Sequence, residues 1–384
     1  MSQQRVAIVG AGILGLAHAR SAVQRGHLVT VFERGPRAGG ASIRNFGMIW
    51  PIGQPAGEWH ELALDSRHRW LEVGTAAGLW VNPCGSIHLA HREDEWNVLQ
   101  EFAQQAGQLG FDCQLLSAAE VKGRTPAANP ADLLGGLFSP TELCVNPRRV
   151  VPGIAKWLAE QFLVRFSFAT TVLEVAQGTV GDTVTLRTSD GMEQNFDRVI
   201  VCSGIDLQTL FPDVLSSRRL KLCKLQMLKT RPQPTGWKLG PHLASGLTLR
   251  HYRNFASCPS LTTLRERIAA ESPELDQFGI HVMAAQNEVG EVILGDSHEY
   301  DAAVEPFDKA QIDELMLREL RRIIQLPDWT IAEKWHGYYT KHESSPVIED
   351  TPQPNVHLCT AVGGAGMTLS FGLAERAWQR WTSA

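Results

Sequence analysis

The sequence predicts an α/β fold in which a domain with a parallel sheet is interrupted by an inserted α+β domain, itself built on a mostly antiparallel sheet. Three observations support this prediction. Residues 5–33 have the pattern of a strand, a glycine turn, a helix and a second strand. After residue 216 the pattern changes to strands separated by loops and occasional helices, and after about 328 the strand–glycine–helix pattern returns. A chain of 384 residues is long enough for two such domains.

The opening unit, residues 5–33, is the most specific of these signals. An apolar strand, Arg5–Val9, leads into glycines with G-x-G-x-x-G spacing, a helix over 13–24 and a second strand, Leu28–Phe32. The glycines allow a tight turn, a close approach to a pyrophosphate and close helix–strand packing, and the acid after the second strand can bind ribose hydroxyls. This is a Rossmann-like dinucleotide site, and its expected contacts are Gly10, Ala11, Gly12, Ile13, Leu14, Gly15, Glu33 and Arg34.

A second loop of small residues, GGAS at 39–42, follows the acid. NAD enzymes usually continue directly into the next helix at this point, whereas a flexible loop can wrap a pyrophosphate and pass under a ring system. The loop therefore favours FAD, and the alternative is a plain surface loop. Its expected contacts are Gly40, Ala41, Ser42, Arg44 and Asn45.

The middle of the chain continues both domains. Helices are expected at 58–78, 93–109, within 117–126 and from Pro147 to about Gln161. Strands are expected at Ser86–Ala90, 137–139, 165–169, 171–175, 184–187 and 197–202. The last of these ends in Ser203 and Gly204 and fits a parallel strand that returns to the dinucleotide site. Val175, Ser203 and Gly204 are therefore added to the expected cofactor contacts.

Most of the antiparallel sheet is expected to come from residues 216–329. Strands are expected at 221–230, 247–252, 279–285 and Glu291–Gly295, with helices at about 260–270 and 308–325 covering one face. A sheet of this kind, inserted between parts of a nucleotide-binding domain, forms a substrate domain.

The end of the chain returns to the cofactor. A strand at 330–341 can cross between the domains, a strand at 354–361 follows, and the glycine-rich VGGAGMTLSFG at 362–372 opens a terminal helix at 373–381. A helix N-terminus near a flavin would stabilise the negative charge of its reduced form, and the alternative is an ordinary glycine-rich turn. The added contacts are Gly337, Gly363, Gly364, Gly366, Met367 and Thr368. The predicted FAD domain comprises 1–85, 145–215 and 330–384, and the substrate domain comprises 86–144 and 216–329.

Bulk properties exclude several classes of function. A net charge of −5 gives no electrostatic support for nucleic-acid binding. We find no apolar run of the roughly 18 residues that a membrane span needs, and no secretory signal at the N-terminus. The seven cysteines are scattered without C-x-x-C spacing, which indicates reduced thiols in a cytoplasmic protein. The histidines lack metal-ligand spacing, so no metal site is expected. The oligomeric state stays open.

Taken together, these residues resemble the D-amino acid oxidase family, with glycine oxidase and sarcosine oxidase as relatives. The resemblance rests on GAGILG at 10–15, Glu33, GGAS at 39–42, VNPRR at 145–149, VIVCSG at 199–204 and GGAGMTLSFG at 363–372. It implies FAD, a two-domain fold and oxidation of a C–N bond with hydride transfer to flavin N5. Sarcosine oxidases link FAD to a cysteine in the crossing strand. Here that strand carries WHGYY at 335–339, so FAD is expected to be non-covalent.

The substrate is less closely defined. Amino acid oxidases commonly place an arginine in the crossing strand to hold a carboxylate, and here Tyr339 and Lys341 occupy that region. RNFGMIWPIGQPAGE at 44–58, GLTLRHY at 246–252 and LGDSHEY at 294–300 resemble a bacterial subgroup associated with aminophosphonate breakdown. That resemblance implies an anionic amine such as 2-aminoethylphosphonate or its N-methyl derivative.

Candidate anion-binding residues come from several segments. Arg250 and Tyr252 are expected to share one face of a strand, with His251 on the other. His298 either contacts the ligand or is a structural histidine, and Arg44 contacts either FAD or substrate. The expected substrate residues are Tyr252, Arg250, Tyr339, Lys341 and His298.

The expected reaction converts the amine to an imine, which water hydrolyses to an aldehyde plus ammonia or methylamine, while oxygen is reduced to hydrogen peroxide. The alternatives are a D-amino acid, glycine or sarcosine oxidase, a dehydrogenase that passes electrons to another acceptor, and a non-enzymatic FAD-binding protein. Nothing in the sequence favours Ser/His/Asp hydrolysis.

Overall fold

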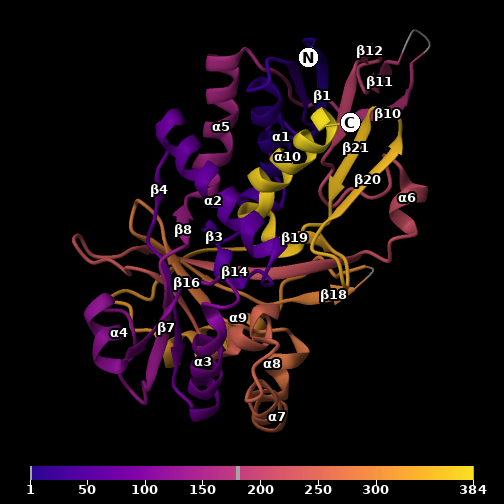
Figure 1. Ribbon diagram of the computed structural model, residues 1–384. Coiled ribbons are helices and arrows are strands. Elements are labelled where there is room, and N and C mark those ends of the chain that lie inside the picture. The colour runs from indigo at the N-terminus through magenta and orange to yellow at the C-terminus, as the bar shows by residue number, and fades with distance from the viewer. Residues whose placement is uncertain (1, 179–181, 302, 384) are drawn as a thin grey trace.

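The computed structural model describes residues 2–178, 182–301 and 303–383 (Figure 1). A six-stranded sheet lies in the upper half of Figure 1 and most of a nine-stranded sheet in the lower half, with the long strands β14 (Lys221–Pro232) and β19 (Ile331–Lys341) running across the middle. Both termini lie in the upper half. This arrangement confirms the predicted fold class.

The six-stranded sheet is built around β1 (Arg5–Val9). The strand pairs in parallel with β2 (Leu28–Phe32) on one side and β13 (Arg198–Val201) on the other. The sheet continues outward to three further strands, which are β9 (Arg165–Ser167), β21 (Val356–Thr360) and the antiparallel edge strand β20 (Ile348–Gln353). The opening unit therefore folds as its sequence pattern predicts, whereas the antiparallel strand at 348–353 was not predicted.

Other elements cover both faces of this sheet. The apolar side chains on the two sides of β1 are buried beneath them. Val6 and Ile8 pack against the helices, whereas Ala7 packs against a three-stranded sheet. The helices are α1 (Ile13–Val23), α2 (Glu58–Ala77), α5 (Pro147–Phe162) and α10 (Gly366–Ser383). The strands of the smaller sheet are β10 (Val172–Gln177), β11 (Val184–Thr188) and β12 (Glu193–Phe196), so the predicted hairpin has a third strand.

The nine-stranded sheet joins two distant parts of the chain. β5 (Ser86–Ala90) pairs in parallel with β15 (His242–Ala244), and the other pairings in this sheet are antiparallel among the described residues. The remaining strands are β6 (Gln114–Ser117), β7 (Gly135–Ser139), β16 (Met283–Gln286), β17 (Glu291–Gly295) and β18 (Glu299–Asp301). Its helices, in the lower half of Figure 1, are α3 (Glu93–Ala106), α4 (Ala118–Arg124), α7 (Leu261–Glu271), α8 (Pro273–Gln277) and α9 (Ala310–Ile323).

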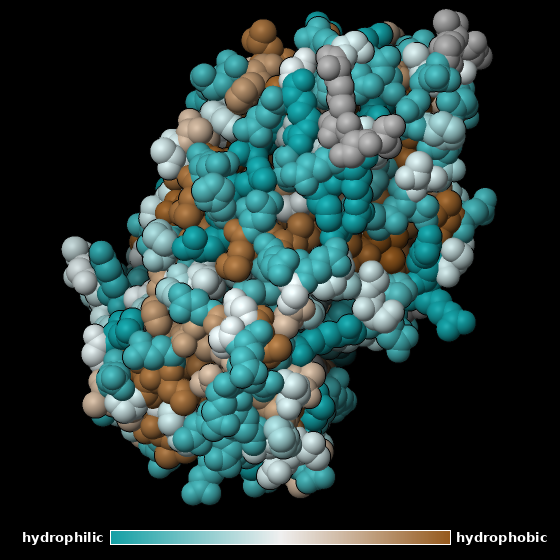
Figure 2. All heavy atoms as spheres, in the orientation of Figure 1, coloured by the Kyte–Doolittle hydropathy of each residue, from teal (hydrophilic) through white to brown (hydrophobic). Residues whose placement is uncertain are grey.

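Short elements connect the two halves. A small three-stranded sheet contains β3 (Met48–Ile49), β8 (Leu143–Val145) and β4 (Val81–Asn82), and a short helix, α6 (Pro212–Ser216), follows β13. The described residues include no helix with both the length and the apolar composition to cross a bilayer. Hydrophilic side chains predominate on the face shown in Figure 2, with hydrophobic patches between them.

Three local predictions were wrong. Residues 247–252 form no strand, because Thr248 donates from both its amide and its hydroxyl to the Ser245 carbonyl and closes a 3-10 turn over Gly246–Arg250. The terminal helix begins at Gly366 rather than at 373, directly after a 3-10 turn over Gly363–Ala365. Finally, the strand expected at 279–285 begins only at Met283.

The crossing strand β19 belongs to a different sheet from the one that the predicted domain division assigns to it. It pairs with β14 from Lys221 to Thr230 and so belongs to the nine-stranded sheet, although its residues fall in the range 330–384 assigned to the FAD domain. The division into domains stays a prediction.

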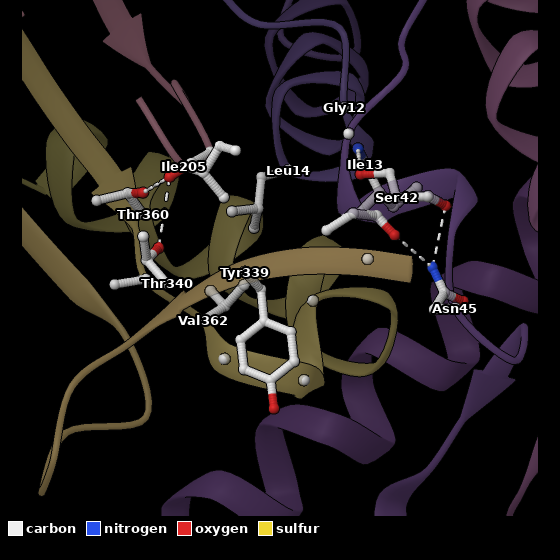
Figure 3. Close-up of a pocket in the computed structure, with 18 of the residues that line it drawn as sticks. Gly12, Ile13, Leu14, Ser42, Asn45, Ile205, Tyr339, Thr340, Thr360 and Val362 are labelled. Atoms are coloured by element: carbon white, nitrogen blue, oxygen red, sulfur yellow. Dashed lines mark hydrogen bonds between the residues drawn. The ribbon is translucent and has the colours of Figure 1, made fainter. Parts of the chain in front are cut away.

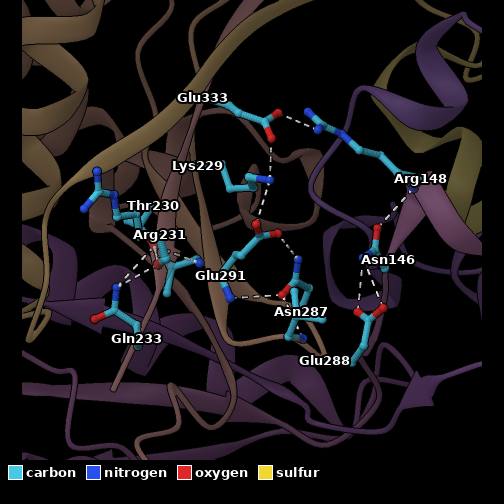
Figure 4. A network of polar contacts seen from close by, with 12 residues as sticks. Asn146, Arg148, Lys229, Thr230, Arg231, Gln233, Asn287, Glu288, Glu291 and Glu333 are labelled. Atoms are coloured by element: carbon cyan, nitrogen blue, oxygen red, sulfur yellow. Dashed lines mark hydrogen bonds and ion pairs between the residues drawn. The ribbon is translucent and has the colours of Figure 1, made fainter. Parts of the chain in front are cut away.

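A polar network ties α5 to the nine-stranded sheet (Figure 4). Glu333 of β19 accepts from Arg148 of α5 at 2.5 Å and from Lys229 of β14 at 2.8 Å, and Lys229 also pairs with Glu291 of β17 at 2.8 Å. Burial alone would lower the pKa of Lys229, but the hydrogen bonds to Glu291 and Glu333 outweigh it and raise that pKa. The ammonium therefore holds two carboxylates together.

We expect Lys229→Met to destabilise the protein by about 2 kcal/mol, because two carboxylates would then face each other without their shared cation. The apparent melting temperature of the variant should fall measurably below that of wild type. Lys238→Met, which changes an exposed lysine in the same way, is the control. Equal melting temperatures for both variants would contradict the role assigned to Lys229.

A second prediction concerns pH. Burial raises the pKa of the Glu95 carboxyl to about 7, although it accepts from the His91 amide at 2.9 Å and lies 3.4 Å from Arg267. The folded state therefore binds a proton that the unfolded state releases near pH 4.5, and wild type loses stability as pH rises from about 4.5 to 7. Over this pH interval the free energy of unfolding falls by about 3 kcal/mol.

We expect Glu95→Gln to gain thermal stability relative to wild type when pH is raised from 5 to 8. Glutamine keeps an oxygen acceptor for the His91 amide and carries no charge to bury. Melting temperatures of both proteins at the two pH values give the comparison. A difference that does not change with pH would show that Arg267 keeps Glu95 ionised in the folded protein.

Candidate active site

A cavity of about 770 Å³ runs from the turn between β1 and α1 to the strands β14 and β19. Figure 3 shows Gly12, Ile13 and Leu14 at one side of it, and Tyr339 and Val362 at the other. It therefore brings together residues from the first and last parts of the chain. The cavity also reaches the nine-stranded sheet, where Leu225, Met227 and Met283 line it.

The glycines of the first turn are required by close backbone packing. A Cβ atom on Gly15 would lie 1.9 Å from the Gly10 carbonyl oxygen, and one on Gly10, where φ is +104°, would lie 2.4 Å from the Cys202 carbonyl oxygen. The loop at 39–42 closes over the same turn, because the Ile13 amide donates to the Ser42 hydroxyl at 2.9 Å. The start of α1 therefore lines the cavity without a side chain at Gly12, and a phosphate can approach its backbone there.

Glu33 stands at the end of β2 beside this turn. One carboxylate oxygen accepts from the Ala11 amide and the other from the Gly35 amide, each at 3.0 Å. Each oxygen keeps a further lone pair, so the carboxylate can also accept from ribose hydroxyls. Its two backbone contacts orient it toward the cavity that it lines.

The opposite end of the cavity is formed by the last part of the chain. Residues 363–368 line it with the first turn of α10, and the Thr368 hydroxyl accepts from the Trp50 amide at 2.9 Å. The Gly204 carbonyl accepts from the Thr360 hydroxyl at 3.0 Å, joining β21 to the segment after β13. Arg44 donates to the His336 carbonyl at 3.3 Å. A second helix N-terminus therefore faces the cavity.

Most residues expected to bind the cofactor line this cavity. They are Gly10, Gly12, Ile13, Leu14, Gly15, Glu33, Arg34, Gly40, Ala41, Ser42, Arg44, Asn45, Ser203, Gly204, Gly337, Gly363, Gly364, Gly366, Met367 and Thr368. The other two have different places. Val175 packs in the hydrophobic core, and Val172 of the same strand lines the cavity instead. Ala11 takes part through its amide, which holds Glu33.

This combination, a phosphate cradle with an acid beside it and a long cavity that ends at a second helix N-terminus, defines a flavoprotein-type dinucleotide site. A model of the FAD dependent oxidoreductase family matches residues 5–380. The chain belongs to that family and is an FAD-dependent enzyme. The residues present fit FAD, because the cradle excludes side chains and Glu33 retains free acceptor capacity.

Solved structures share the fold. L-proline dehydrogenase from P. horikoshii superposes with a TM-score of 0.79 at 16% identity, covering 100% of this chain and 94% of that one. Glycine oxidase from Geobacillus kaustophilus gives 0.76 at 17% identity, with coverages of 100% and 95%. An L-amino acid deaminase from Proteus vulgaris gives 0.70 at 21% identity, with coverages of 97% and 88%.

Four of the five expected substrate residues line the cavity, namely Tyr252, Tyr339, Lys341 and His298. Arg250 does not. Its guanidinium pairs with Asp276 and donates to the Ile280 carbonyl at 2.9 Å, because the 3-10 turn directs it away from Tyr252. The expectation that Arg250 and Tyr252 share a strand face is therefore wrong.

Lys341 lies in a small polar cluster with two tyrosines. Its ammonium is 3.4 Å from the Tyr300 hydroxyl, which is 3.5 Å from the Tyr339 hydroxyl. Burial lowers the pKa of Lys341 and raises the pKa of both phenols, so the tyrosines stay protonated at neutral pH. Of these three residues, Lys341 and Tyr339 line the cavity.

A group of histidines lines the cavity near this cluster. His251, His281 and His298 lie with their rings in contact, and Asp296 is beside them. Burial lowers the pKa of all three imidazoles, that of His298 to about 4, and raises the pKa of the Asp296 carboxyl. Sequence reasoning named only His298 as a site residue. The D-x-H spacing of Asp296 and His298 was a usable signal, but nothing local marked His281.

Proposed function

We propose that this enzyme oxidises the C–N bond of an anionic amine, with an aminoalkylphosphonate such as 2-aminoethylphosphonate or its N-methyl derivative as the substrate class. The observation that carries this proposal is the pair Lys341 and Tyr339, which line the same cavity as the FAD site and are linked through the Tyr300 hydroxyl. A tetrahedral phosphonate can take several separate donors. A planar carboxylate is best held by the paired donors of an arginine.

An arginine that lines the same cavity supports the same preference. Arg253 lines the cavity, but its guanidinium donates to the Ser344 carbonyl at 3.1 Å and to the Glu343 carbonyl at 2.7 Å. These bonds occupy donors that a carboxylate would need. The Arg250 guanidinium forms an ion pair with Asp276 and does not line the cavity. The donors near Lys341 are therefore single groups, because the guanidinium groups of Arg250 and Arg253 are both occupied.

In the proposed reaction, FAD supplies the acceptor for the hydride that leaves the carbon bearing nitrogen. Lys341 and Tyr339 bind the anionic group and so position the amine in the cavity. The imine product is hydrolysed by water to an aldehyde with release of ammonia or methylamine, and oxygen takes the two electrons to form hydrogen peroxide. FAD is held without a covalent bond, because β19 carries no cysteine.

Anaerobic mixing tests the substrate class directly. The FAD-loaded enzyme is mixed with 2-aminoethylphosphonate, N-methyl-2-aminoethylphosphonate, glycine, sarcosine, D-alanine and L-proline, and loss of flavin absorbance is followed. We expect fast bleaching by at least one phosphonate. Bleaching by D-alanine, glycine, sarcosine or proline, with neither phosphonate active, would overturn the proposed class. Acid precipitation should release the flavin into the supernatant.

A further inference from the structure

Three histidines and one aspartate form a cluster that the proposed reaction does not use. His251 follows the 3-10 turn, His281 precedes β16, and Asp296 and His298 follow β17. We call these four residues the histidine cluster. All four line the cavity. They are brought together because backbone hydrogen bonds pair His281 with Asp296 in both directions, each at 3.3 Å.

Several polar atoms of the histidine cluster are buried without hydrogen-bond partners among the described residues. These are both ring nitrogens of His281 and one carboxylate oxygen of Asp296. His281 Nε2 lies 3.6 Å from Asp296 Oδ1, and His298 Nε2 lies 3.7 Å from Asp296 Oδ2, too far for ordinary hydrogen bonds. Burying polar atoms in this state is costly unless a ligand satisfies them.

The spacing of these atoms suits a metal ion. One donor nitrogen from each of the three histidines lies within 4.8 Å of the other two. Ligand atoms at about 2.0–2.1 Å from a tetrahedral Zn²⁺ are about 3.4 Å apart. Small movements of the three side chains would therefore bring their nitrogens to the separation that a bound ion requires. His298 Nδ1 lies 3.2 Å from the Gly279 carbonyl oxygen, and as donor it leaves Nε2 with a free lone pair. Outer hydrogen bonds of this type orient metal-binding histidines.

We infer that the histidine cluster binds one divalent transition-metal ion through His251, His281 and His298, with Asp296 beside it and a coordination position facing the cavity. Three imidazole ligands with an open position are typical of Zn²⁺ sites that bind an exchangeable ligand. That position takes an anionic oxygen of the substrate. This last assignment rests on the proposed function, whereas the metal site itself does not.

Cobalt binding tests the site without substrate. The FAD-loaded enzyme is treated with a chelator, dialysed against Co²⁺ and analysed for metal per chain and for visible absorption beyond the flavin bands. We expect about one ion per chain. His281→Ala and His298→Ala should each weaken binding at least tenfold. His68→Ala, which removes a histidine with 71% side-chain exposure, should bind Co²⁺ as wild type does.

A second buried group, His18, His357 and Cys359, could also hold an ion, so the experiment must separate the two. X-ray absorption of the wild-type complex should show imidazole ligands and no sulfur, a result that does not depend on whether any variant folds. Sulfur ligation, loss of binding in His18→Ala but not in His281→Ala, or no retained Co²⁺ would overturn the inference. Because no amine is present, these outcomes are independent of flavin bleaching.

Discussion

Gly15→Ala will purify largely without flavin. The added methyl carbon would lie 1.9 Å from the Gly10 carbonyl oxygen and 3.2 Å from Ile8, so α1 must move away from the turn that holds the pyrophosphate. Backbone cannot yield as a flexible side chain can, and we expect FAD affinity to fall by a factor of 100 or more, about 3 kcal/mol. The ratio of flavin to protein absorbance after gel filtration measures the loss.

Two further alanine variants provide a graded control. On Gly12 the added atom would lie 3.0 Å from the Ser42 hydroxyl, which belongs to a side chain that can rotate, so an intermediate loss is expected. On Gly123 of α4 it would meet open space, and flavin content should equal that of wild type. A Gly15→Ala protein that retains flavin as Gly123→Ala does would show that the cradle does not depend on close packing of α1.

Lys341→Met will weaken binding of an anionic amine by about 10- to 100-fold. The substitution keeps an unbranched side chain one atom shorter but removes the ammonium beside Tyr300, and a hydrogen bond to a charged group contributes about 1.5–3 kcal/mol. The dissociation constant is measured anaerobically from the spectral change of the flavin on titration. Flavin content should be unchanged, because the role proposed for the lysine is to bind the substrate.

An uncharged amine of the same chain length is the matched control for Lys341→Met. Its affinity should not change, because it has no anionic group for the ammonium to hold. Lys341→Arg keeps the positive charge and should recover part of the affinity for the anion. Equal losses for the charged and uncharged amines would contradict an anion-binding role and indicate a general change in the shape of the cavity.

The cofactor half of the site was predictable because its signals are local. Gly10, Gly12 and Gly15 are spaced by the geometry of one turn, and Glu33 follows from the length of one helix and one strand. The same holds for 363–368, where glycines open a helix. The fold class followed from the same strand–glycine–helix pattern together with the change in periodicity after residue 216.

The substrate half was predicted less well because it depends on contacts between distant segments. Apolar residues at 247 and 249 suggested a strand, but Ser245 and Thr248 close a 3-10 turn that directs Arg250 away from the cavity. His281 and Asp296 meet only through the packing of the segments beside β16 and β17. The hydrophobic periodicity of one segment does not indicate which distant segment it will contact.

The pairing of β19 with β14 has a consequence for substrate selection. Gly337, Tyr339 and Lys341 alternate along β19 and so share one face, and all three line the cavity. At about 3.3 Å per residue, some 13 Å of strand separate the first residue from the last. Because β14 pairs with β19 along this length, the distance between Gly337 and Lys341 is fixed by the sheet. If Lys341 holds the anionic group as proposed, this fixed spacing selects amines by the distance between their nitrogen and their anionic group.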